Sequence, residues 1–572
     1  MRRVKPSPLR PARTAVPERV APEAVSPSAP FRATKQLGLV LLCLAWVALG
    51  LVGRAPWKTE DAITFAVAWE MVQRGDWLVP YVAQELAFTE APLVPWLSAA
   101  TLVLFAPPLD APDAGRLAVG VLLVLLLAFT GFAGRELNGR AMRWVPVLVV
   151  VGSVGLFDRA HQLSGELGLA VAVIAAIYAV ALSLRRPLAG GAALGGAVGA
   201  SFLAAGWLGP LWTLVPALVL PWFGSGWRSR AYGATLAVAL AVALPLAASW
   251  PLALHLRAPE LYDAWRSAEP LASYFPLLPG SGEPDPLWLA KNLVWFAWPA
   301  VPLIAWAAWI RGRGFNGGLR EPGVIVPGVY AAWMLAMLAL MPEQRLMELL
   351  PVLAPLALLA SLEVDSLKRG HSAALDWFGI LTFGLVALAL WGFWIDAYFN
   401  GMSARVAILL RDTETGYGTS FHLRAMFAAL FLTALWIVLV RPARRSNRRA
   451  VLNWAAGMTL IWGLSATIWL PYVDARRTYQ AIGETLGVHR PYDGCIARRD
   501  VGLAQRALFY HFAGIVTVPE STPEGARCPV LLVQYGRLSD GVPLLDGYAK
   551  VWEGGRRGDR SERYALYRKA SP

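Results

Sequence analysis

Long apolar runs recur along the whole chain and are separated by short polar loops. A helix that crosses a membrane needs about 20 consecutive, mostly apolar residues. Runs of this kind lie at residues 37–53, 115–134, 143–157, 165–184, 188–205, 207–223, 231–254, 288–310, 323–341, 345–362, 373–395, 422–440 and 450–470. The pattern predicts a mainly α-helical polytopic membrane protein with about 13 transmembrane helices.

The composition agrees with this pattern. Of the 572 residues, 56% are hydrophobic and 16% charged, whereas a soluble domain has about 45–50% apolar and about 25% charged residues. These few charges cannot cover the surfaces of several soluble domains. A soluble multidomain enzyme, a disordered chain and a disulfide scaffold are therefore excluded.

The basic residues set the orientation of the helices. The net charge is +14, and the basic residues fall in short runs between apolar segments, such as Arg185–Arg186, Arg311–Arg313 and Arg441–Arg449. Loops of this kind face the cytoplasm, whereas a nucleic-acid surface would gather them on one folded face. Residues 1–36, rich in Pro, Ala and Arg, are expected to form a disordered basic cytoplasmic tail. Thirteen helices then place the C-terminus outside.

Three outward segments are too long to be turns: 54–114, 255–287 and 396–421. The first of them contains two helical patterns, at residues 62–73 and 92–105. Apolar helices of this length can lie in the plane of the membrane interface. We therefore expect interfacial helices in the first outer loop.

The last part of the chain, residues 471–572, differs from the rest. Its pattern predicts a small outer α/β domain with helices at 475–486 and 503–512 and strands at 495–497, 530–535, 548–552 and 564–567. Cys495 and Cys528 both fall in it, and an oxidising compartment permits a disulfide between them. Two buried, unpaired thiols are the open alternative.

Acidic residues at the predicted membrane boundary gather on the outer side. Glu60 and Asp61 directly follow the first apolar run, and ionisable groups at this depth are costly and often functional. The alternative is structural: Thr59 would cap a helix, and both carboxylates would favour its dipole.

Two further polar clusters lie at outer boundaries. Asp158, Arg159 and His161 precede Glu166 between the third and fourth predicted helices; the alternative is a merely polar loop. Arg345 precedes the tenth helix and is either a phosphate ligand, since a guanidinium binds phosphate bidentately, or a residue that reaches the interface.

Residues 60–97 contain, in order, Glu-Asp-Ala, Glu-Met, Gly-Asp-Trp-Leu-Val-Pro, Phe-Thr-Glu-Ala-Pro-Leu and Trp-Leu. This stretch resembles, without a gap, the pattern Asp-Glu-Ala, Glu-Met, Gly-Asp-Trp-Leu-Val-Pro, Phe-Glu-Lys-Pro-Pro-Leu and Trp-Leu of the aminoarabinose transferase and protein O-mannosyltransferase group of GT-C membrane glycosyltransferases. Residues 75–80 carry the most specific part. The resemblance implies a GT-C domain over residues 37–470 in a bacterial inner membrane, with residues 471–572 in the periplasm.

The chain departs from the family pattern at several charged positions. The order of the first two carboxylates is exchanged in Glu60-Asp61, and Thr89-Glu90 stands where the family has Glu-Lys. The family lysine expected to hold the donor phosphate is thus missing, as is a second one at Ala205. The chain therefore has acidic residues at most positions where the family has them, and it lacks several of the family's basic residues.

The resemblance implies an inverting glycosyl transfer from a polyprenyl-phosphate sugar to an envelope acceptor such as lipid A or another glycolipid. Such transfer needs a carboxylate to take the acceptor proton and cations to stabilise the leaving phosphate. Glu60 is the candidate base, with Asp61 orienting the acceptor or sharing that role.

The other candidate residues divide into sugar or acceptor ligands and phosphate ligands. Glu90, Glu166 and His161 are expected to bind the sugar or the acceptor. The cations expected at the phosphate are Arg345, Lys58, Arg159, His255 and Arg257. No motif has metal-ligand spacing, so no cofactor is expected to be required, although His255 could join a first-loop acid on a divalent metal.

Three other functions remain open. One is a carrier or flippase of lipid-linked sugars, although no internal repeat of the transporter type is present. Others are a protein O-glycosyltransferase and a non-catalytic or inactive member of the group. Movement of an intact lipid-linked sugar would identify the carrier, and its consumption would identify a transferase.

Overall fold

The computed structural model describes residues 29–268, 285, 287–341, 344–410, 421–441, 446–489, 494–536, 545–556, 559 and 561–569. Most of the predicted tail 1–36, and parts of the outer segments 255–287 and 396–421, lie outside the described residues. The contacts between residues divide the chain into two units, residues 1–41 and 42–572. The hydrogen bonds, ion pairs and ring contacts of the polar loops and the candidate site all lie within the second unit.

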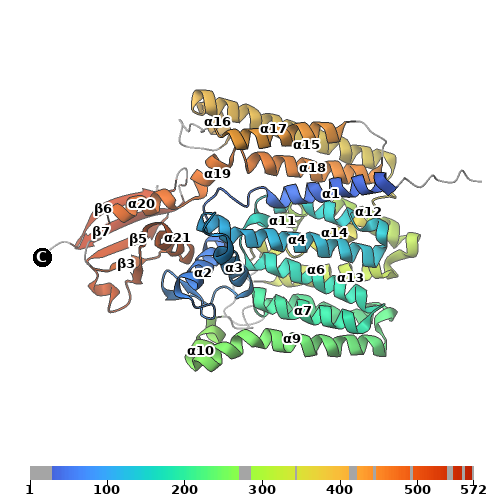
Figure 1. Cartoon of the computed structure of the whole chain (residues 1–572), viewed down its shortest axis with the longest axis horizontal. Helices are drawn as coiled ribbons and strands as arrows, with labels where there is room; N and C mark the ends of the chain where they lie inside the picture. The colour runs from blue at the N-terminus through green and yellow to red at the C-terminus, as the bar shows by residue number, and fades with distance from the viewer. Residues whose placement is uncertain are drawn as a thin grey trace, which may run out of the picture. The chain divides into compact units, whose positions relative to one another are not determined.

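Among the described residues, seven helices are long and apolar enough to cross a membrane; Figure 1 labels each of them. They are α4 (Ala111–Asn138), α6 (Gly165–Ser183), α7 (Pro187–Ala205), α9 (Arg230–Arg257), α13 (Pro322–Leu340), α15 (Arg369–Asn400) and α17 (Leu423–Val440). Three bent pairs bring the number to ten if each pair is one span. The bends are 60° between α5 (Val145–Val151) and the turns after it, 96° between α11 (Trp288–Phe296) and α12 (Ala300–Gly312), and 68° between α18 (Asn447–Ser465) and α19 (Leu470–Arg477).

Shorter apolar helices account for the remaining predicted spans. They are α1 (Ala29–Ala48), α8 (Leu208–Phe223) and α14 (Leu353–Ser361). All thirteen predicted segments thus coincide with a helix or a bent pair, and the mainly helical fold class is confirmed. The number that crosses the membrane stays a prediction.

Helix α1 begins at Ala29, within the segment predicted as a tail, and the predicted apolar run starts near residue 37. The residues between these points include alanine and the polar residues arginine, lysine and glutamine, all of which favour helix. Pro30 falls in the first turn, where its missing N–H costs nothing.

The first outer loop contains the two predicted helices, α2 (Glu60–Arg74) and α3 (Leu93–Phe105). Between them strands β1 (Tyr81–Val82) and β2 (Glu85–Leu86) pair antiparallel. Ala83 and Gln84 have positive φ values of 50° and 69°, as a two-residue hairpin turn requires. The sequence lacks the usual glycine there, which is why the hairpin was not predicted.

Side-chain contacts join several of the polar loops between the helices. At one end Arg448 binds the Asp365 carboxylate at 2.5 Å and the carbonyl oxygen of Ala141 at 2.8 Å, and Arg185 pairs with Glu136. These contacts join four polar loops, at residues 135–142, 185–187, 363–372 and 441–449, and the alternation of the predicted helices assigns all four to the cytoplasmic side. The alternation of helices inferred from the basic loops agrees with this grouping; which compartment each end faces stays a prediction.

Residues after α19 form the predicted α/β domain. Its elements are α20 (Gln480–Val488), β3 (Ile496–Arg499), α21 (Leu503–Ala513), β4 (Thr517–Pro519), β5 (Val530–Tyr535), β6 (Tyr548–Gly555) and β7 (Arg563–Lys569). The sheet order is β4-β3-β5-β7-β6, with β3 parallel to β4 and β5 and the pairs β5–β7 and β7–β6 antiparallel. Cys495 and Cys528 form a disulfide with a Cα–Cα distance of 5.0 Å, which decides the alternative left open above.

Two details of this domain differ from the prediction. The helix expected at 475–486 is two helices, because Thr478 is extended and its hydroxyl accepts a hydrogen bond at 3.1 Å from the N–H of Gln480 at the start of α20. Strand β4 was missed because it is three residues long and ends at Pro519, a residue tolerated at a sheet edge.

The α/β domain is held against the first outer loop by ion pairs. Glu85 of the β1–β2 hairpin binds Arg498 and Arg506, each at 2.5 Å. Lys58 binds Glu562 at 2.8 Å. Helix α21 also packs against α2. The ion pairs and this packing together hold the loop that carries Glu60 and Asp61 against the α/β domain.

Candidate active site

Glu60 and Asp61 open helix α2 and take separate partners. Successive residues of an α-helix are rotated by about 100°, so the two adjacent carboxylates point in different directions. The hydroxyl of Thr59 makes no capping hydrogen bond. Capping by Thr59 is therefore absent, and the surroundings of each carboxylate decide its role.

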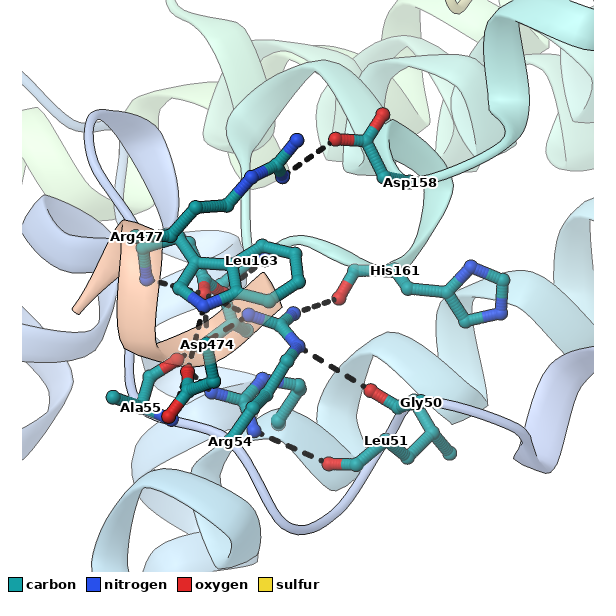
Figure 2. A network of polar contacts seen from close by, with 12 residues as sticks. Gly50, Leu51, Arg54, Ala55, Asp158, His161, Leu163, Asp474 and Arg477 are labelled. Carbon is teal, nitrogen blue, oxygen red and sulfur yellow. Dashed lines mark hydrogen bonds and ion pairs between the residues drawn. The ribbon is translucent and has the colours of Figure 1, made fainter. Parts of the chain in front are cut away.

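Asp61 is fully buried in a network of ion pairs and hydrogen bonds, part of which Figure 2 shows. Its Oδ2 accepts from Arg54 at 2.8 Å and from the N–H of Trp57 at 3.0 Å, and lies 3.8 Å from Arg116. Its Oδ1 accepts from the N–H of Leu163 at 2.9 Å. Burial alone would raise the pKa of Asp61, but the two guanidiniums and two backbone donors hold it below its usual value. Both oxygens of this carboxylate are thus engaged by the protein.

The same network ties several segments together. Figure 2 shows Arg54 reaching the carbonyl oxygen of His161, at 2.7 Å, and Arg477 reaching Asp158, also at 2.7 Å. Asp474 of α19 accepts hydrogen bonds from the first outer loop. The start of α2, the loop before α6 and helix α19 are thereby fixed relative to one another.

Three carboxylates and one guanidinium form a second group, the carboxylate cluster: Glu60, Glu90, Glu166 and Arg345. Oε1 of Glu60 lies 3.8 Å from Nη1 of Arg345. Glu90 interacts electrostatically with the other three, as does Glu166. The three carboxylates are partly exposed, and the Arg345 side chain is 58% exposed. Unlike Asp61, these groups are accessible to a substrate.

Local structure explains how the cluster forms. The hydroxyl of Ser164 caps α6 by accepting a backbone hydrogen bond at 3.3 Å, which places Glu166 in the first turn. A Cβ atom at Gly165 would lie 2.6 Å from the carbonyl oxygen of Ala204 and 3.9 Å from Oε2 of Glu90. Glycine therefore permits the close approach of the start of α6 to the end of α7, and the Glu90 side chain lies beside this junction.

Glu90 holds its proton unusually tightly. It sits deep in the protein, although part of its surface is exposed. Burial is the largest cause, and the charges of Glu166 and Glu60 act in the same direction, so that the pKa of Glu90 rises to about 8. Thr64 and Arg345 oppose this rise, but the Thr64 hydroxyl makes no hydrogen bond of normal geometry. At pH 7 Glu90 is therefore mainly a neutral acid, which can donate a hydrogen bond as well as accept one.

Three cations expected at the donor phosphate are engaged by carboxylates. Lys58 pairs with Glu562 at 2.8 Å, Arg257 with Asp76 at 2.8 Å, and Arg159 lies 3.6 Å from Asp158. Of the predicted phosphate ligands, the structure brings Arg345 into the cluster.

The two candidate histidines are placed differently. His161 is fully buried, with Nε2 2.9 Å from the carbonyl oxygen of Trp46 and its ring stacked 4.5 Å from Trp462. The structure places this histidine among packed aromatic rings, and its predicted binding role stays a prediction. His255 is exposed, with its ring 5.5 Å from that of Tyr262. Within the described part of the chain, no group of three or more His, Cys, Asp or Glu side chains could hold a metal ion.

Arg54 and Arg116, the partners of Asp61, were not predicted. Both are buried, and Arg116 lies within the apolar helix α4. A lone arginine in an apolar run is the signal that could have identified it, because such residues need a partner. Arg54, directly before the first-loop carboxylates, had no comparable signal.

Comparison with known proteins gives relatives that extend over most of the chain. No family model matches. The undecaprenyl phosphate-α-4-amino-4-deoxy-L-arabinose arabinosyl transferase of Aeromonas salmonicida is 24% identical over 489 residues, or 82% of each chain. A second transferase of that name, from Pseudomonas fluorescens, is 27% identical over 62% of this chain and 63% of its own.

The fold has a solved counterpart. ArnT from Cupriavidus metallidurans, in a crystal structure bound to undecaprenyl phosphate, superposes with a TM-score of 0.63 at 16% identity, covering 94% of this chain and 98% of that one. The chain thus has the GT-C fold of this solved membrane protein. More narrowly, its sequence is similar over most of its length to the aminoarabinose transferases, as the first outer loop led us to expect.

Proposed function

We propose that the chain is an inverting membrane glycosyltransferase that moves a sugar from a polyprenyl-phosphate donor to an envelope acceptor. The observation that carries this proposal is the carboxylate cluster: three accessible carboxylates around one exposed guanidinium, at one end of the helical domain. The aminoarabinose transferases to which the chain is similar are named for an undecaprenyl-phosphate sugar. A sugar donor of that class supplies both a phosphate and a reacting anomeric carbon.

Glu60 is the proposed base. Its side chain is 18% exposed and lies 3.8 Å from Arg345. A carboxylate here can take the proton of an acceptor hydroxyl as the hydroxyl oxygen attacks the anomeric carbon. The bond from that carbon to the phosphate oxygen breaks, and Arg345 stabilises the negative charge that the leaving phosphate gains.

Glu90 and Glu166 are proposed to hold the sugar or the acceptor. Glu90, neutral at pH 7, can donate a hydrogen bond to a phosphate or sugar oxygen. Asp61 is proposed to position Glu60 instead of sharing its chemistry, since its oxygens are bound by Arg54 and two backbone N–H groups.

The cellular setting follows the same proposal. The protein would lie in a bacterial inner membrane with its N-terminus in the cytoplasm and the α/β domain in the periplasm. Lipid A or another glycolipid is the proposed acceptor, because the carboxylate cluster lies beside predicted membrane-boundary segments. Lys58, Arg159 and Arg257 would serve the donor phosphate only by leaving their present carboxylate partners.

The test is consumption of a polyprenyl-phosphate sugar. Purified protein is incubated with undecaprenyl-phosphate aminoarabinose and extracted envelope lipids, and released undecaprenyl phosphate is measured. We expect turnover that falls by at least about 100-fold in Glu60→Gln, since general-base catalysis contributes about 10²–10⁴-fold. Glu260→Gln, an exposed carboxylate of α10 (Pro259–Ala268), serves as the matched control and should retain full activity.

Other outcomes would favour other functions. Unchanged turnover in Glu60→Gln would remove Glu60 from the chemistry. Transport of the intact donor across a vesicle without its consumption would identify a carrier. Sugar found on a protein instead of a lipid would move the proposal to protein O-glycosylation.

A further inference from the structure

A large apolar pocket lies between α12 and α15, outside the carboxylate cluster. Its volume is about 660 Å³, and its walls include Trp298, Trp306 and Trp309 on one side and Leu375 and Phe378 on the other. Ligand pockets in proteins measure about 300–1,000 Å³ and are mostly apolar. The pocket therefore has the size and the chemistry of a site for a lipid chain.

The pocket lies at the opposite end of the helical domain from the cluster. Arg345 stands before α14, whereas Leu367, which lines the pocket, follows that helix. The neighbouring residue Asp365 binds Arg448, within the group of loops predicted to face the cytoplasm. Because α14 separates the two sites, the pocket does not belong to the proposed sugar-transfer site.

Basic side chains surround the mouth of the pocket. Arg313 lies over Trp309, 3.9 Å from the ring centroid, and the ring of His371 lies 5.2 Å from that of Trp306. Lys368 directly follows the pocket residue Leu367, and all three of these basic side chains are exposed, as is Arg369.

The acids near this mouth already have partners. Glu363 is bound by Arg311 at 2.5 Å and by Asn316, and Asp365 is bound by Arg448. Among the described residues, no ion pair is recorded for Lys368 or for the exposed arginines beside it. The rim therefore offers positive charge above an apolar interior.

We propose that this pocket binds an anionic phospholipid of the adjacent leaflet. Its acyl chains fill the space between α12 and α15, and its headgroup phosphate contacts Lys368, Arg369 and Arg313. Basic sites between transmembrane helices bind anionic headgroups in this way. The occupant is a bilayer phospholipid and not the sugar donor, since the donor's phosphate belongs at the carboxylate cluster. The lipid site does not depend on the proposed glycosyl transfer, so either proposal can fail without affecting the other.

Native mass spectrometry of the full-length protein in detergent tests this site. The probes are phosphatidylglycerol and phosphatidylcholine with identical acyl chains. Ala374→Trp fills the pocket, and Ala373→Trp, on the same helix but outside the lining, is its control. The double variant Lys368→Ala/Arg369→Ala removes two charges at the surface and leaves the apolar interior unchanged. It tests the site even if Ala374→Trp prevents the protein from folding.

We expect the wild type to retain phosphatidylglycerol in preference to phosphatidylcholine. Each removed cation should weaken binding roughly fivefold, so the double variant should lose about thirtyfold. Ala374→Trp should lose the bound lipid, whereas Ala373→Trp and Arg186→Ala, an exposed cation elsewhere on this end, should keep it. Equal retention of both lipids, or unchanged binding in Ala374→Trp, would overturn the proposal. Displacement of phosphatidylglycerol by equimolar undecaprenyl phosphate would also overturn it and assign the pocket to the donor's chain.

Discussion

The charge of Glu90 offers a direct test of the carboxylate cluster. A neutral Glu90 can donate a hydrogen bond to the donor phosphate, whereas an ionised Glu90 adds a negative charge beside Glu60 and Glu166 and repels that phosphate. The pKa of Glu90 is about 8. The neutral form is therefore about 90% populated at pH 7 and about 10% at pH 9. We expect kcat/KM to fall about tenfold between these two pH values.

The matched variant is Glu90→Gln, which keeps the shape and stays neutral. Donor consumption is measured from pH 6 to 9.5 in detergent with a saturating acceptor lipid. Wild type and Glu260→Gln should lose activity with a midpoint near pH 8, and Glu90→Gln should not. Titration of the substrates themselves would appear in all three proteins. A decline of equal depth in Glu90→Gln would refute the assignment of the titrating group to Glu90.

The same shift has a consequence for stability, and its sign is opposite to that of a salt-bridged acid. Folding disfavours the ionised form of Glu90, so the unfolding free energy should fall as pH rises from about 4.5 to about 8 and then level off. Glu90→Gln should therefore melt at a higher temperature than the wild type at pH 8.5. The two proteins should melt together near pH 4.5.

Two further changes test the buried contacts. Asp61→Asn leaves Arg54 and Arg116 without their shared carboxylate and should lower the unfolding free energy by about 3–5 kcal/mol. Folded protein recovered at low temperature should turn over more slowly, because Glu60 is less well positioned, and unchanged turnover would remove the positioning role of Asp61. Replacing Cys495 and Cys528 by serine should destabilise the α/β domain by about 2–4 kcal/mol, measured as earlier proteolysis of that domain, and wild type treated with dithiothreitol should match the variant.

Helix positions could be predicted because lipid imposes a simple rule on the sequence. Every backbone polar group in a membrane must be paired within its own helix, so length and hydropathy alone locate the segments. Bends do not follow from that rule. The segment 288–310 met the length for one span, yet it turns by 96° near Pro299, where a proline N–H is missing from the hydrogen-bond ladder.

The carboxylate cluster was predictable in its members but not in its arrangement. Glu60, Glu90, Glu166 and Arg345 each stood at an outer boundary or in a family-like motif, and alternation of helices brings such boundaries to one end. The difference between Glu60 and Asp61 could not be read from the sequence. It depends on rotation about α2 and on Arg116, which lies 55 positions away along the chain and meets Asp61 only in the folded protein.

The ion pair between Lys58 and Glu562 sets an order of assembly for the protein. Its two residues are 504 positions apart, and Lys58 stands two residues before Glu60. At about 5–20 residues per second, synthesis of the intervening chain takes roughly 25–100 s. During that interval the segment around Lys58 lacks the contact that finally holds it. The proposed catalytic carboxylate therefore reaches its final setting only after the last domain has been synthesised and folded, so an unfinished chain carries an unfinished site.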